Sequence, residues 1–131
     1  MIVLDTHVWV WWVSNPDQLS SGARIAIDQS MADSKVFISS ISAWEIAMLV
    51  ARGRLELTMP VRDWIAISEG LSFLHFVPVT NNIAIKSVQL PGELHGDPAD
   101  RLIVATALSM GSALVTKDEK ILNYPHVKTI W

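Results

Sequence analysis

Short apolar runs recur along the chain and predict the strands of a buried sheet. Ile2-Val3-Leu4 contains no polar residue and stops at Asp5, which is the pattern of a strand covered by helices on both faces. Further runs predict strands at Val36–Ile38, Phe76–Val79, Ala113–Thr116 and, as a possible fifth, Val127–Trp131. Because Pro78 cannot donate to a sheet ladder, we expect the Phe76–Val79 strand at an edge of the sheet.

Between these runs, apolar residues recur at helical spacing among polar ones. The predicted helices are Thr6–Val13, a segment after Ser20-Ser21-Gly22 that carries Ile25, Ile27 and Met31, Ser42–Ala51, a segment opened by Pro60, Asn81–Gln89, Asp97–Gly111 and Asp118–Leu122. Alternating strands and helices predict a three-layer α/β/α sandwich around a central parallel sheet of four to five strands. We expect a single domain over residues 1–131.

Composition limits the classes of protein that the chain can belong to. Half of its 131 residues are hydrophobic, which is enough for one domain with a sizeable core. No apolar run approaches the length of a membrane span, and no basic region precedes Ile2, so we expect neither a membrane segment nor a signal peptide, and a cytoplasmic location. The absence of cysteine excludes disulfides and thiolate metal sites.

The net charge of −3 argues against a protein that holds nucleic acid by bulk positive charge. A nuclease of this charge would need bound cations or a local basic rim. The candidates for such a rim are Arg52, Arg54, Arg101, Lys117 and Lys120.

Topology brings four acidic residues to one edge of the predicted sheet. Asp5 and Asp118 follow strands, so both belong at the C-terminal edge, where open α/β sheets bind ligands. Glu45 and Asp100 fall in the first turns of helices that start at the same edge. Clustered carboxylates repel one another unless positive charge lies among them. Carboxylate oxygens favour Mg²⁺ or Mn²⁺ over zinc, and such ions activate water for attack on phosphorus.

Each acid also has a purely structural interpretation. Ser42-x-x-Glu45 matches a capping box, in which the glutamate bonds back to the start of the helix. Asp97-Pro98 is a near-ideal helix start, and we assign Asp97 to that cap alone. Asp5 and Asp118 could cap the helices that follow them. Taken singly, capping explains each acid as well as metal binding does, but four caps meeting by chance at one edge is the less economical interpretation.

Four segments carry a recognisable set of motifs: Leu4-Asp5-Thr6-His7, Trp44-Glu45-Ile46, Gly96–Ala107 with its Asp-Arg-Leu-Ile string, and Leu114–Asp118. Together they resemble the PIN-domain ribonucleases, and most closely the VapC toxins of bacterial and archaeal toxin–antitoxin pairs. The resemblance implies that Asp5, Glu45, Asp100 and Asp118 bind Mg²⁺ or Mn²⁺ and position water for RNA cleavage. It also implies a nearby hydroxyl residue, a homodimer and a small VapB-like antitoxin that covers the acidic pocket. Thr6 and Thr116 both fit the hydroxyl residue.

Two other functions stay open at this point. A nuclease of the same fold could cleave DNA or act in RNA processing. A phospho-acceptor receiver domain also places acids after its first strand, but it needs an aspartate at the end of its third strand. This chain has Thr80-Asn81-Asn82 after the third predicted strand.

The roles of several aromatic and basic residues can also be predicted. Trp9, Trp11 and Trp12 cannot all face the core from one helix, so we expect one or two at the surface, where they would suit a dimer or antitoxin interface. Trp44 is expected to pack inside. Of the four histidines, only His7 is expected near the acids, and a structural or surface role is favoured for it. Arg101 is expected in the basic rim or beside a carboxylate that it orients.

Overall fold

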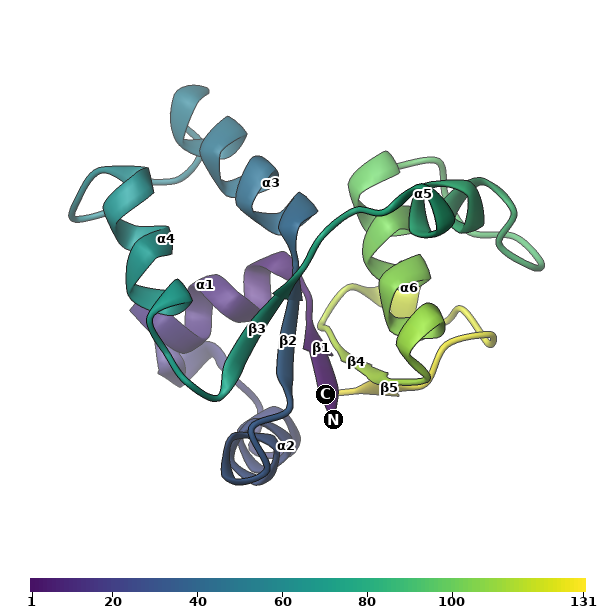
Figure 1. The fold of residues 1–131 in the computed structure, drawn as a ribbon, viewed down its shortest axis with the longest axis horizontal. Helices are drawn as coiled ribbons and strands as arrows, with labels where there is room; N and C mark the ends of the chain where they lie inside the picture. Colours follow the sequence, from purple (N-terminus) through teal and green to yellow (C-terminus); the bar gives the residue numbers. More distant parts are fainter.

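The computed structural model describes residues 1–131 as a five-stranded parallel sheet between helices (Figure 1). The strands are β1 (Ile2–Leu4), β2 (Val36–Ser39), β3 (Leu74–Val77), β4 (Ala113–Val115) and β5 (Thr129–Ile130), and they lie in the order β3-β2-β1-β4-β5. Every neighbouring pair is parallel, which confirms the predicted sheet. No helix of the structure has the length and apolar character needed to cross a membrane.

The helices alternate with the strands and form the two outer layers. They are α1 (Thr6–Ser14), η1 (Pro16–Gln18, a 3-10 turn), α2 (Ser21–Ala32), α3 (Ser40–Ala51), α4 (Val61–Glu69), α5 (Asn81–Val88), α6 (Pro98–Met110) and α7 (Glu119–Leu122). In Figure 1, α1, α3 and α4 lie on one side of the sheet, and α5 and α6 lie on the other.

Alternation along β1 assigns its side chains to two separate cores. Ile2 and Leu4 pack with α1, α2, α3 and α4, whereas Val3 points to the opposite face and packs with α5, α6 and α7. All three side chains are almost completely buried, so the unbroken apolar triplet is a strand covered on both faces. The three-layer α/β/α sandwich is therefore confirmed.

The third strand lies at the edge, as predicted, but it starts and ends two residues earlier than Phe76–Val79. Its register pairs Val36 with Leu74 and Ser39 with Val77. Pro78 follows the strand and has no N–H to continue the ladder, which explains why the pairing stops at Val77.

The tryptophan predictions were wrong in their details. Trp9 is completely buried, and Trp11 and Trp12 are half-buried against the same core, so none of the three is an exposed surface residue. Trp11 packs on Trp131 and Trp12 on Phe73, at centroid distances of 5.9 Å in both pairs. Trp44, expected to pack inside, is 55% exposed on α3.

The centre of the sheet is a topological switch point. From β1 the chain passes to β2 on one side, and it later returns to β4 on the other side. The carboxyl ends of β1 and β4 thus lie side by side where the strand order reverses, which is the position at which open α/β sheets bind ligands.

Candidate active site

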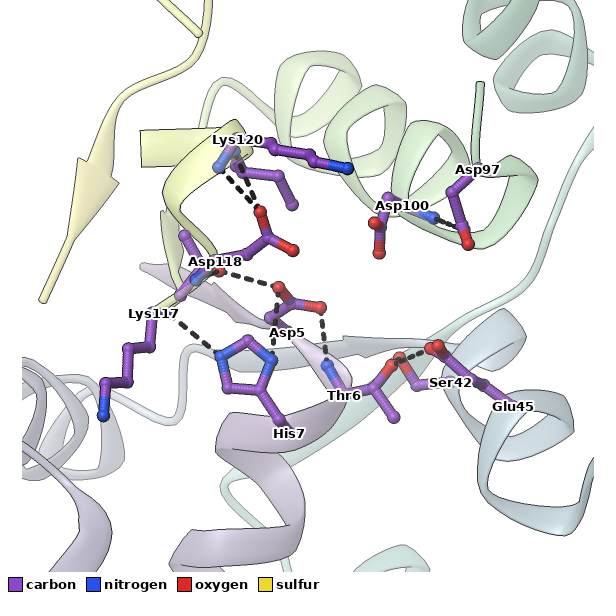
Figure 2. Close-up of polar contacts among 12 residues, drawn as sticks. Asp5, Thr6, His7, Ser42, Glu45, Asp97, Asp100, Lys117, Asp118 and Lys120 are labelled. Carbon is purple, nitrogen blue, oxygen red and sulfur yellow. Dashed lines mark hydrogen bonds and ion pairs between the residues drawn. The ribbon is translucent and has the colours of Figure 1, made fainter. Parts of the chain in front are cut away.

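The four predicted acids line one cavity of about 340 Å³ at the carboxyl ends of β1 and β4. Asp5, Glu45, Asp100 and Asp118 arrive there from four different segments, as predicted from topology (Figure 2). A second cavity of about 390 Å³ adjoins the first and shares Asp100, Asp118 and Asp97 with it. The two cavities therefore meet along a row of acids.

Asp5 is the most deeply buried of the four, and Thr116 holds it. It follows β1 directly and caps α1, with Oδ1 accepting from the Thr6 amide at 2.8 Å. Oδ2 accepts from the Thr116 hydroxyl at 2.7 Å. The same hydroxyl accepts from the Asp118 amide at 3.0 Å, so Thr116 ties together the ends of β1 and β4.

Glu45 is held by the other threonine, although not in the way that the capping-box pattern predicted. Helix α3 begins at Ser40 because Ser39, the last residue of β2, caps it by accepting from the Ile41 amide. Glu45 therefore lies in the second helical turn, and Ser42 lies inside the helix, so the capping box and the first-turn placement were wrong. Glu45 Oε1 instead accepts from the Thr6 hydroxyl at 2.6 Å, and the same hydroxyl lies 2.9 Å from Ser42 Oγ.

Asp97 and Asp118 cap helices and line the cavities at the same time. Asp97 accepts from the Asp100 amide at 3.0 Å, which confirms its assignment to the cap of α6. Asp118 Oδ1 accepts from the Lys120 and Ile121 amides at the start of α7. Capping uses one oxygen of each carboxyl, so the structural and functional interpretations are compatible. The sequence missed that Asp97 lines both cavities.

Burial and mutual repulsion raise the pKa of three acids. Burial is the largest cause for Asp5, Glu45 and Asp100, and neighbouring carboxylates add to it: Asp118 for Asp5, Asp5 for Glu45, and both Asp5 and Asp118 for Asp100. Hydrogen bonds and His7 oppose the shift without cancelling it. The pKa of Asp100 is raised to about 6. The charged forms of these three acids are destabilised in the cavity, and a bound cation would offset that cost.

The sequence matches the PIN-domain family model over residues 2–127. The chain belongs to the PIN-domain family. It is 36% identical to Ribonuclease VapC22 of Mycobacterium tuberculosis over 132 residues, which cover 99% of this chain and 98% of the relative.

Solved structures with the same fold include VapBC toxin–antitoxin complexes. DNA-bound VapBC from Salmonella typhimurium matches with a TM-score of 0.68 and 22% identity, covering 98% of this chain and 95% of the other. VapBC2 from Rickettsia felis, bound to a promoter DNA fragment, matches with a TM-score of 0.70 and 19% identity, covering 98% of this chain and 97% of the other. FitAcB from Neisseria gonorrhoeae matches with a TM-score of 0.69 and 22% identity, covering 98% of this chain and 96% of the other. The receiver-like alternative is wrong for this PIN domain, because β3 runs into Pro78 and no acid follows it.

The donor chemistry of this PIN domain fits a hard divalent cation. All four predicted ligands are carboxylates that line one cavity, and no sulfur donor lines it; the only nitrogen ligand type there is the imidazole of His7. In this structure, no three acidic or histidine side chains are positioned to hold one metal ion together. Each carboxyl is instead bonded to its own neighbours. Glu45, Asp100 and Asp118 are only half-buried, whereas Asp5 is buried.

The predictions for the histidines and cations of this PIN domain are confirmed only in part. His7 does lie beside the acids: Nδ1 is 3.6 Å from Asp5 Oδ2, while Nε2 accepts from the Lys117 amide at 2.9 Å. The Lys117 side chain points away from the carboxylates in Figure 2, and its Nζ lies 5.7 Å from the ring centre of Trp11. His95, which the sequence did not single out, lies 2.7 Å from Asp100.

Arg101 neither orients a carboxylate nor belongs to the basic rim. Its Nε donates to the Ser87 carbonyl at 2.9 Å and its Nη1 to the Leu94 carbonyl at 2.8 Å. Of the five rim candidates, only Arg54 lines the first cavity and only Lys120 lines the second. Neither of the two forms an ion pair.

Proposed function

We propose that this PIN domain is a Mg²⁺- or Mn²⁺-dependent endoribonuclease that acts as the toxin of a VapBC-type pair. One observation carries the proposal: Asp5, Glu45, Asp100 and Asp118 meet in one cavity at the switch point of the sheet. The 36% identity to Ribonuclease VapC22 over nearly the whole chain supports RNA as the substrate.

The four carboxylates would hold the ion, and two hydrogen bonds and the His7 imidazole 3.6 Å away hold the Asp5 carboxyl in place. When bound, the ion supplies neutralisation of phosphate charge and a water of lowered pKa. Thr116 holds Asp5, and Thr6 holds Glu45, so both threonines are candidates for the hydroxyl residue that the resemblance implies. Each fixes the orientation of one carboxyl.

The decisive experiment measures RNA cleavage by the purified protein with Mn²⁺ and after its removal with a chelator. We expect cleavage of single-stranded RNA and not of single-stranded DNA of the same sequence, loss on chelation, and a rate at least about 100-fold lower in Asp5→Asn. The matched control is Asp63→Asn, an exposed acid on α4 outside both cavities, which should cleave at the wild-type rate. Equal rates in wild type and Asp5→Asn would refute the proposal.

Arg54 and Lys120 would bind the RNA phosphates on either side of the acids. They lie in the first and the second cavity respectively, separated by the row of acids that both cavities share. A strand that crosses this row could contact both cations. We expect Arg54→Ala and Lys120→Ala to raise KM several-fold with little change in kcat and to reduce the salt slope of binding by about 1 each.

The controls for the two cations are Arg52→Ala and Lys128→Ala, which remove exposed cations outside both cavities. These variants should keep the wild-type KM and salt slope. If Arg52→Ala weakened RNA binding as much as Arg54→Ala, bulk charge rather than the position in the cavity would control binding.

The toxin assignment implies a small VapB-like antitoxin and a homodimer, as in the resemblance to the VapC family. Structural similarity to VapBC complexes supports the antitoxin partner. We expect induction of this chain to stop bacterial growth, Asp5→Asn to be harmless, and coexpression of a short neighbouring reading frame to restore growth and to copurify. Growth arrest by Asp5→Asn equal to that of the wild type would contradict toxicity through cleavage.

A further inference from the structure

His95 lies in the loop between α5 and α6, and its imidazole contacts one of the four acids. His95 Nε2 is 2.7 Å from Asp100 Oδ2, at a side-chain exposure of 20% and 19%. Asp100 lines both cavities, whereas His95 lines only the second. The imidazole therefore contacts the Asp100 carboxyl from the side of the second cavity. The same carboxyl still faces the first cavity, which Asp5 and Glu45 also line.

The second ring nitrogen determines the direction of this hydrogen bond. His95 Nδ1 is buried and has no hydrogen-bond partner. A neutral imidazole carries its proton on one nitrogen only, and a proton on Nδ1 would be buried without an acceptor. The hydrogen-bond network thus assigns the proton to Nε2, which donates it to Asp100 Oδ2.

The loop that carries His95 is held by two side chains from other elements. Arg101 donates to the carbonyl of Leu94, the residue before His95, and to the carbonyl of Ser87 at the end of α5. The Tyr124 hydroxyl donates to the carbonyl of Pro91. Arg101 comes from α6, which also carries Asp100, so the guanidinium fixes the distance between His95 and the helix that bears its partner.

We propose that His95 is a positioning residue for Asp100 and that Arg101 holds the loop from which His95 acts. This inference rests on the proposed function, because it treats Asp100 as a ligand of the ion. His95 occupies Oδ2 and fixes the rotation of the carboxyl, so Asp100 loses less side-chain freedom when it binds a cation. Hydrogen-bonding partners of metal ligands contribute about 10- to 100-fold in affinity in characterised sites.

The test compares two amides at position 95, with Mn²⁺ binding measured by calorimetry at neutral pH. The amide nitrogen of glutamine falls near the place of Nε2, whereas that of asparagine falls near the place of Nδ1. We expect His95→Asn to weaken Mn²⁺ binding about 10-fold or more and His95→Gln to stay within about threefold of the wild type. Thermal unfolding should show both variants folded, which excludes a general loss of structure.

The outcomes separate this inference from the proposed function. If the wild type binds Mn²⁺ and cleaves RNA, but both variants bind Mn²⁺ as tightly as the wild type, His95 does not position Asp100 and the nuclease proposal stands. Equal weakening in both variants would also overturn the role of the Nε2 donor. If the wild type neither binds Mn²⁺ nor cleaves RNA, both proposals fall.

Discussion

At the scale of single residues, Thr116 connects two acids that lie far apart in the sequence. Its hydroxyl donates to Asp5 Oδ2 across 111 positions of the chain and accepts from the Asp118 amide. Thr116 is completely buried, so no water replaces these bonds when they are lost. The Thr6 hydroxyl donates to Glu45 Oε1 but accepts from no backbone amide.

Thr116→Val tests this arrangement at nearly constant side-chain volume. We expect the free energy of unfolding to fall by about 2 kcal/mol, because a buried carboxyl and a backbone amide each lose a partner. Thr116→Ser keeps the hydroxyl and should remain within about 1 kcal/mol of the wild type. Urea denaturation measures both values, and equal stability of the two variants would show that the hydroxyl contributes nothing.

At the scale of elements, helix starts bring the site together. Asp5, Ser39, Asp97 and Asp118 cap α1, α3, α6 and α7, and the side chain of each accepts from a backbone amide of its helix. One residue, Asp5, separates β1 from α1, and no residue separates β2 from α3. The side chains at these two junctions therefore have little freedom to move away from the site. Backbone geometry consequently holds Asp5 and Asp118 at the site before any ion binds.

Helix α6 is terminated by a residue whose backbone only glycine adopts easily. Gly111 has φ of 62° in the left-handed region, and a Cβ there would meet no other atom. Gly111→Ala should therefore cost about 1 kcal/mol of unfolding free energy through backbone strain alone. Gly96→Ala is the control, since that position is equally open and has no positive φ. Equal destabilisation of both variants in urea titrations would contradict the strain argument.

At the scale of the whole molecule, the clustered acids oppose folding at neutral pH. Burial raises the pKa of Asp100 to about 6, above the ordinary value of 3.8. The folded state therefore binds this proton more tightly than the unfolded state, so the stability that protonation contributes is present below about pH 4 and is lost as pH rises through 6. Without metal, the protein should have a higher Tm at pH 5 than at pH 7.

The variant Asp100→Asn isolates the contribution of this carboxyl. An amide oxygen can still accept from His95 but carries no charge, so we expect the Tm at pH 7 to rise by about 3 °C. The increase in Tm on going from pH 7 to pH 5 should be smaller than in the wild type. Cleavage activity should be lost. A variant with a lower Tm at pH 7 than the wild type would show that the charge of Asp100 stabilises the fold.

Metal should reverse this electrostatic cost. An ion that binds only the folded protein stabilises it by about 2.7 kcal/mol when its concentration is 100 times its Kd. Because the carboxyls must lose their protons to bind, the stabilisation should be large at pH 7.5 and small at pH 5. Differential scanning calorimetry with Mn²⁺, with Ca²⁺ as a comparison, measures it, and an increase in Tm that is independent of pH would place the ion elsewhere.

Sequence patterns alone predicted the layers, the edge position of β3 and the meeting of the four acids at one edge. These follow from local patterns, because apolar runs and helical spacing define elements, and right-handed crossovers leave few ways to arrange them. A parallel sheet then places the carboxyl ends of all its strands, including β1 and β4, at the same edge.

The hydrogen-bond partner of each acid, in contrast, could be learned only from the folded molecule. The start of α3 at Ser40, the pairing of Thr6 with Glu45, the contact of His95 with Asp100 and the position of Arg54 depend on contacts between distant segments. Such contacts are set by packing and side-chain rotamers after the chain has folded, and no local pattern of the sequence records them.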